Sequence, residues 1–75
     1  MTPMPLGEMY SDNYRGTTYS AKGRLSPQGG FAGEYRIGLG KDDPWIRCGS
    51  RFDSLSEALE GAKTAARAAI DELLG

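Results

Sequence analysis

The sequence predicts an α+β domain in which a three-stranded antiparallel meander packs on one C-terminal α-helix, a two-layer β-β-β-α arrangement. Apolar residues recur every three or four positions over residues 53–74, the period of one helix face. Three upstream segments, residues 14–25, 31–39 and 45–52, alternate apolar and polar side chains between short turn sequences. Because a lone amphipathic helix must bury its apolar face, we expect the sheet to cover it. Residues 1–13 are expected to form a flexible N-terminal tail, and residues 14–75 a single domain.

The expected helix carries its own start signal. Ser54 with Glu57 three residues later is typical of a capping box, and acidic residues suit the positive end of the helix dipole. The middle of the apolar stripe is alanine, so we expect the helix to lie close to its partner surface. Gly61 costs about 1 kcal/mol relative to alanine inside a helix. It either permits a close contact or is simply tolerated.

The three expected strands would present one apolar face to the helix. The first two are joined by residues 26–29, Ser-Pro-Gln-Gly, which suit a type I turn. A β-bulge at Gly33 or Gly49 would move part of the pattern to the other face. The side chains expected on the covered face are Tyr19, Tyr35, Ile37, Leu39, Ile46, Cys48 and Phe52.

Composition narrows the class of protein. A chain of 75 residues with 25% charged residues is long enough for one small globular domain. Its single cysteine permits no intramolecular disulfide, which fits a reducing cytoplasm. Residues 1–13 have no basic start and no continuous apolar run, so they do not indicate a signal peptide. The helix carries too many charges to span a bilayer. We therefore expect a cytoplasmic protein with no membrane partner.

The net charge of −1 conceals an uneven distribution. Residues 14–52 hold seven basic and three acidic side chains, whereas residues 53–75 hold two basic and five acidic ones. Arginine suits phosphate recognition, and an exposed tryptophan suits stacking on a base. Alternatively, these charges merely keep the uncovered face of a two-layer protein soluble. The candidate nucleic-acid-binding residues on that face are Lys22, Arg24, Arg36, Trp45, Arg47 and Arg51.

The residues that usually carry catalysis are scarce. The chain has no histidine, the commonest general base and metal ligand. Asp42 and Asp43 stand before Pro44, where aspartate favours turn geometry. Cys48 is expected to be a buried structural thiol. Residues 38–41, Gly-Leu-Gly-Lys, lack Walker A spacing. We therefore predict no enzyme activity, no catalytic residues, no cofactor, no metal site and no small-molecule ligand.

Residues 52–58, Phe-Asp-Ser-Leu-Ser-Glu-Ala, followed by an alanine-rich helix, resemble the AP2 domain and the integrase arm-type DNA-binding domains. The resemblance implies a sheet-and-helix fold that reads DNA with sheet residues, here Arg36, Trp45, Arg47 and Arg51. The chain is also similar to small bacterial β-β-β-α proteins without an assigned activity, which implies a bacterial source. We expect a non-catalytic module that binds nucleic acid. The alternative is a protein-interaction or self-association (homodimer) domain that uses an edge strand, Trp45 or apolar residues of the tail.

Overall fold

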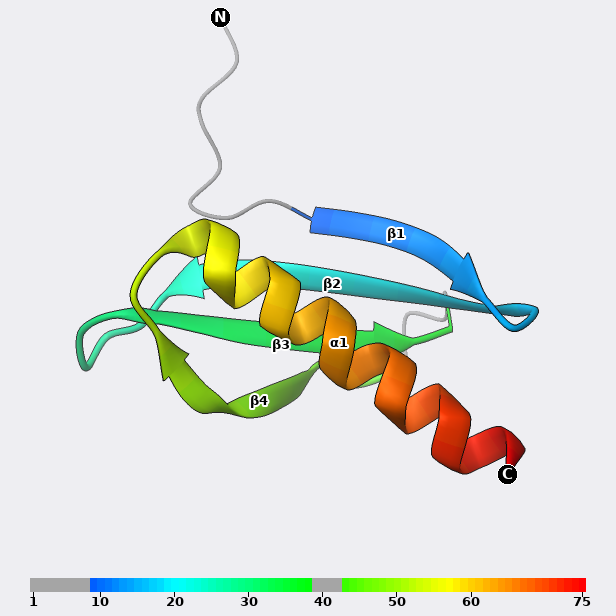
Figure 1. Ribbon diagram of the computed structural model, residues 1–75. Coiled ribbons are helices and arrows are strands. Elements are labelled where there is room, and N and C mark those ends of the chain that lie inside the picture. Colours follow the sequence, from blue (N-terminus) through cyan, green and yellow to red (C-terminus); the bar gives the residue numbers. More distant parts are fainter. Residues whose placement is uncertain (1–8, 39–42) are drawn as a thin grey trace, which may run out of the picture.

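The computed structural model describes residues 9–38 and 43–75, with the side chains of residues 49 and 50 left aside. An antiparallel sheet of order β1-β2-β3-β4 is crossed on one face by a single helix, α1 (Figure 1). The α+β class, with an antiparallel meander on a C-terminal helix, is confirmed. The elements are β1 Met9–Tyr14, β2 Thr17–Leu25, β3 Phe31–Ile37, β4 Ile46–Phe52 and α1 Leu55–Leu74.

The sheet has four strands rather than the three that we predict, because residues 9–13 of the expected tail belong to β1. β1 pairs with β2 along its whole length, from Met9 opposite Lys22 to Tyr14 opposite Thr17. Four of its six side chains are exposed, so the apolar alternation that reveals a strand is weak there. Residues 1–8 of the expected tail, and Leu39 of the expected covered face, lie outside the described residues.

A two-residue turn joins β1 to β2. Arg15 and Gly16 both have positive φ, 54° and 81°, as a type I′ hairpin turn requires. The Asn13 side-chain oxygen accepts a hydrogen bond from the Gly16 backbone N–H at 3.1 Å. Arginine is uncommon at the first central position of such a turn. Alternation places Tyr14 at the start of the expected strand 14–25, whereas in the structure Tyr14 ends β1 and the turn follows it.

The covered face of the sheet is built for close approach of α1. Gly23 and Gly33 lie opposite each other on β2 and β3, beneath the first turns of the helix. A methyl group added at Gly33 would lie 2.5 Å from the Ala58 carbonyl oxygen. Sheet and helix backbones therefore nearly touch, as the alanine stripe predicts. The fully buried core cluster contains Tyr19, Ala21, Ala62, Ala66 and Ile70.

Gly61 makes room for an aromatic ring. The Phe52 ring occupies the position that a side chain on Gly61 would take, so alanine at 61 would overlap it. The Cys48 thiol donates to the Gly61 carbonyl oxygen at 3.8 Å. Of the two interpretations of this glycine, close contact is the one that the structure supports.

The helix begins at Leu55 with Ser54 as its N-cap, so the first two residues of the expected range 53–74 precede it. The Ser54 hydroxyl accepts from the Glu57 backbone N–H at 3.1 Å and donates to the Glu57 carboxylate at 3.2 Å. This satisfies one N–H at the start of the helix. The capping box is thus present in a variant form, because the Glu57 carboxylate accepts from the hydroxyl.

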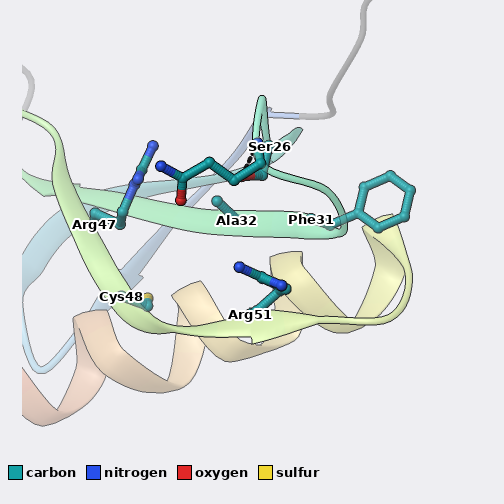
Figure 2. Close-up of a pocket in the computed structure, with 7 residues that line it drawn as sticks. Ser26, Phe31, Ala32, Arg47, Cys48 and Arg51 are labelled. Atoms are coloured by element: carbon teal, nitrogen blue, oxygen red, sulfur yellow. Dashed lines mark hydrogen bonds between the residues drawn. The ribbon is translucent and has the colours of Figure 1, made fainter.

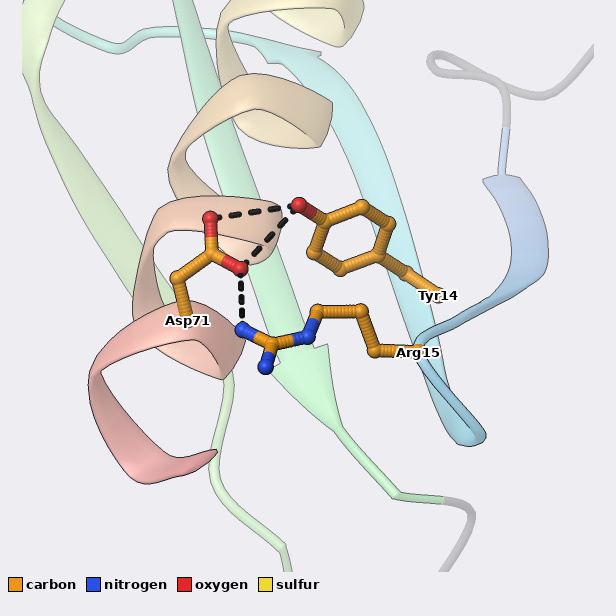
Figure 3. Close-up of polar contacts among 3 residues, drawn as sticks. All are labelled: Tyr14, Arg15 and Asp71. Atoms are coloured by element: carbon orange, nitrogen blue, oxygen red, sulfur yellow. Dashed lines mark hydrogen bonds and ion pairs between the residues drawn. The ribbon is translucent and has the colours of Figure 1, made fainter. Parts of the chain in front are cut away.

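Near its other end, α1 is tied to the β1–β2 hairpin. The Tyr14 hydroxyl lies 3.1 and 3.2 Å from the two carboxylate oxygens of Asp71, and an Arg15 nitrogen lies 2.8 Å from one of them (Figure 3). The hydrogen bond from Arg15, helped by that from Tyr14, lowers the pKa of Asp71, against a smaller opposing effect of desolvation. These contacts connect residues 57 and 56 positions apart, so they fix the added strand relative to the helix.

Candidate nucleic-acid interface

All six candidate residues lie on the face of the sheet that α1 leaves open. Directly paired residues of neighbouring strands point to the same side, and Glu34 of β3 faces Lys22 of β2 and Arg47 of β4. Arg24 reaches the same Glu34 carboxylate, and Arg51 pairs with Ala32 on the same side. The remaining two, Arg36 and Trp45, belong to the same face because the Trp45 ring makes cation–π contacts with both Lys22 and Arg36. We call this surface, defined by the six residues together with Glu34, the open basic face.

Glu34 lies at the centre of the open basic face and is 8% exposed. Its carboxylate lies 3.7 Å from the Lys22 amine, 3.5 Å from an Arg24 guanidinium nitrogen and 4.0 Å from Arg47 Nε. The single buried carboxylate of Glu34 therefore forms ion pairs with three cations, two from β2 and one from β4. Because three cations surround one carboxylate, the open basic face retains an excess of positive charge. The side chains of Lys22, Arg24 and Arg47 are 31 to 54% exposed, so this charge is accessible to solvent.

Trp45 lies across the sheet rather than standing free in solvent. Its ring centroid is 4.1 Å from the Lys22 amine and 4.7 Å from the central carbon of the Arg36 guanidinium. Within the described part of the chain, Arg36 Nε is buried without a hydrogen-bond partner. The ring compensates for part of that lost bonding through the cation–π attraction. Trp45 thus holds two of the cations in place.

An irregularity in β4 separates Arg47 from Arg51. Arg47 faces Glu34 and Arg51 faces Ala32, so four steps along β4 match only two along β3. The two extra residues form a bulge opposite Gly33, in the region where the sequence allows for one. Because the excess is an even number, both arginines remain on the open face.

The bulge opens a recess of about 170 Å³ between the two arginines (Figure 2). Ala32 contributes only a methyl group to it, and the β2–β3 turn closes one side. The aliphatic stem of Arg51 lies against Gly30, where an added methyl would come within 2.8 Å of Arg51 Cγ. The lining residues are Ser26, Gln28, Phe31, Ala32, Arg47, Cys48 and Arg51.

Sequence reasoning missed Ser26, Gln28 and Ala32 as parts of a site. The turn itself is as predicted, with the Gly29 N–H donating to the Ser26 carbonyl at 3.1 Å, and the Ser26 hydroxyl also accepts from the Gln28 N–H at 3.3 Å. Turn chemistry predicted that geometry, but not that β4 would bow away beside it. The glycines at 33 and 49 were the sequence signals for an irregularity at this place.

Cys48 lies at the bulge and is half-buried, contacting the helix on one side and the recess on the other. Desolvation raises the pKa of its thiol, and the negative charge of Glu34 adds to this. The thiol therefore stays protonated near neutral pH, which disfavours nucleophilic chemistry.

The described ranges hold neither a metal-ion cluster nor a membrane-spanning helix. Across residues 9–38 and 43–75, His, Cys, Asp and Glu form no cluster of three or more suited to a metal ion. No helix in those ranges is long and apolar enough to cross a membrane. Asp42, and residues 39–41 of the Gly-Leu-Gly-Lys sequence, lie outside them. Comparisons with protein-family models, curated proteins and solved structures give no match.

Proposed function

We propose that the chain is a small non-catalytic module that binds nucleic acid through the open basic face. One observation carries this proposal: five basic side chains from three strands lie on a sheet face that no described helix covers, and three of them lie within 4.0 Å of the Glu34 carboxylate. Such a face suits a polyanion, because neutralising phosphates releases condensed counterions. The resemblance of residues 52–58 to DNA-binding domains favours DNA as that polyanion.

The arrangement favours phosphate contacts over base reading. Trp45 already lies against Lys22 and Arg36, so its role here is to position these cations. Glu34 similarly restrains Lys22, Arg24 and Arg47. Preorganised cations lose less side-chain entropy when a phosphate arrives. We expect weak sequence preference, strong salt dependence and a Kd of roughly 10⁻⁴ to 10⁻⁶ M at physiological salt.

An amide NMR titration with a short mixed-sequence DNA duplex, at low and moderate salt, tests the proposal. Shifts should centre on β3 and β4 around Arg36, Trp45, Arg47 and Arg51. The double variant Arg47→Gln/Arg51→Gln should lower the slope of log K against log salt by about one unit for each arginine.

The matched control is Lys63→Gln/Arg67→Gln, which removes the same charge from α1. It should change the affinity much less than the sheet variant does. Absence of shifts at low salt, or an equal loss of affinity in both double variants, would overturn nucleic-acid binding through this face.

Self-association is the second candidate, and exposed aliphatic side chains favour it. Leu73 is 71% exposed, Leu74 49% and Ile46 44%. The C-terminal end of α1 projects beyond β3 and β4 (Figure 1), and Leu73 and Leu74 are its last two residues. A second copy of the chain would cover them.

Light scattering across a concentration series tests self-association. The mass should rise with concentration, and Leu73→Gln/Leu74→Gln should abolish the rise. A single monomer mass at every concentration would exclude this candidate. Salt-independent self-association without DNA-induced shifts would favour it over nucleic-acid binding.

A further inference from the structure

The recess between Arg47 and Arg51 has the features of a subsite for one anionic group. It is open to solvent at the open basic face and is closed behind by the β2–β3 turn (Figure 2). Its volume of about 170 Å³ is far more than one water molecule needs, so a phosphate group fits.

The charge in the recess is only partly neutralised. Arg47 shares the Glu34 carboxylate with Lys22 and Arg24. The distance from Arg47 Nε to the carboxylate, 4.0 Å, is the longest of the three ion-pair distances. Within residues 9–38 and 43–75, Arg51 makes no ion pair, and its stem is held against Gly30. A guanidinium that is packed along its stem but lacks a carboxylate partner is poised to bind an external anion.

The neutral lining supplies further donors. The Ser26 hydroxyl oxygen accepts from the Gln28 backbone N–H, which leaves its own proton free to donate. The Gln28 side-chain amide adds two N–H groups. Ala32 keeps the floor open because it is small. The paired N–H groups of a guanidinium, together with hydroxyl and amide donors, can each donate a hydrogen bond to a phosphate oxygen.

We propose that this recess is a phosphate-binding subsite, formed by Arg47, Arg51, Ser26 and Gln28 over Ala32. As part of a nucleic-acid interface it rests on the proposed function, and it specifies where one phosphate of the ligand is held. The phosphate can be a terminal monoester or an internal diester of the strand. Both present the anionic oxygens that the recess recognises.

The subsite is tested first with inorganic phosphate, titrated into the full ¹⁵N-labelled chain at constant ionic strength with chloride as the balancing anion. We expect saturable amide shifts at Gln28, Ala32 and Cys48, with a Kd on the order of 1 mM. Absence of saturable shifts there would overturn the subsite.

Three variants separate a shaped site from general attraction. Arg51→Gln should raise the phosphate Kd about tenfold. Ala32→Val, which fills the floor without changing the charge, should raise it at least fivefold. Arg24→Gln removes an equal charge from the same face outside the recess, and should raise it less than twofold. Equal effects of Arg24→Gln and Arg51→Gln would show only diffuse attraction and overturn the subsite.

Oligonucleotides then distinguish the source of the phosphate. Single strands that carry a 5′-phosphate or a 5′-hydroxyl are compared on wild type and Ala32→Val. Tighter binding of the phosphorylated strand, lost in Ala32→Val, would assign a terminal monoester. Equal binding of both strands, weakened in Ala32→Val, would assign an internal diester.

The two proposals fail separately in these experiments. Saturable phosphate binding without oligonucleotide binding would uphold the subsite and overturn the proposed function. Oligonucleotide binding that is identical in wild type and Ala32→Val would uphold the function and overturn the subsite.

Discussion

The two faces of β2 and β3 constrain their side chains differently, by size on one face and by charge on the other. Alternate residues of the same strands form the two faces. Under α1, Gly23 and Gly33 carry no side chain, and the helix backbone fills the space. On the other side of the sheet, Lys22 next to Gly23 and Glu34 next to Gly33 form an ion pair that belongs to a charged network. The covered face is therefore limited by volume and the open basic face by charge, and the two should respond to different substitutions.

The largest expected effect is steric and lies on the covered face. Gly33→Val should destabilise the protein by about 3 kcal/mol or more, because the new side chain meets the Ala58 carbonyl oxygen and the helix must move. Chemical denaturation measures the change in unfolding free energy. Ala32→Val, one residue away on the open side, is the control and should cost under about 1 kcal/mol. Similar losses in both variants would refute the difference between the faces.

Gly61→Ala sets helix propensity against packing. Propensity alone would stabilise the helix by about 1 kcal/mol. Overlap with the Phe52 ring should reverse the sign and give a net loss of about 1 to 2 kcal/mol. In a Phe52→Leu background the same substitution should cost less or become stabilising. A stabilising Gly61→Ala in the wild-type background would mean that the glycine is merely tolerated.

Glu34→Gln tests the open basic face, where charge should matter more than volume. The variant keeps the shape but leaves Lys22, Arg24 and Arg47 without their shared partner, at a cost of about 1 kcal/mol. Removing a negative charge should also tighten DNA binding about threefold at low salt. Denaturation and the DNA titration measure both effects. Weaker DNA binding at unchanged fold would argue that Glu34 mainly orients the cations.

The smallest effect concerns the hairpin contact with α1, which belongs to neither face. The pKa of Asp71 is lowered, mainly by the hydrogen bond from Arg15, so the folded state favours its ionised form. The resulting stability is present above the ordinary aspartate pKa and disappears as the pH falls through the lowered one. Between pH 5 and pH 2, wild type should lose slightly more stability than Asp71→Asn. Parallel pH profiles in urea denaturation would exclude a contribution from this contact.

Sequence reasoning anticipated the elements with strong periodicity. The alanine stripe and Ser54 predicted α1, and alternation predicted β2, β3 and β4, with strand ends that reach one to three residues too far. It failed for β1, because an edge strand with mostly exposed side chains has little alternation. It also failed for the turn at Arg15, because arginine rarely adopts the positive φ that this position has.

For the candidate site, period-two alternation placed all six residues on the correct face, because the bulge in β4 adds an even number of residues. Alternation could not show that Trp45 would lie on Lys22 and Arg36, since their cation–π contacts join residues from different strands. The recess was equally hidden. It depends on β4 bowing away from Ala32 beside the β2–β3 turn, which is remote from β4 in sequence.

The sequence by itself determined the α+β class, the helix cap and the main turn. These follow from local periodicity and from residue-specific backbone preferences, which act over a few positions. Tertiary structure alone decided that β1 joins the sheet, that Gly61 admits Phe52, and that Glu34 gathers three cations. Each of these depends on the distance between residues remote in sequence, which is fixed only when helix and sheet pack together.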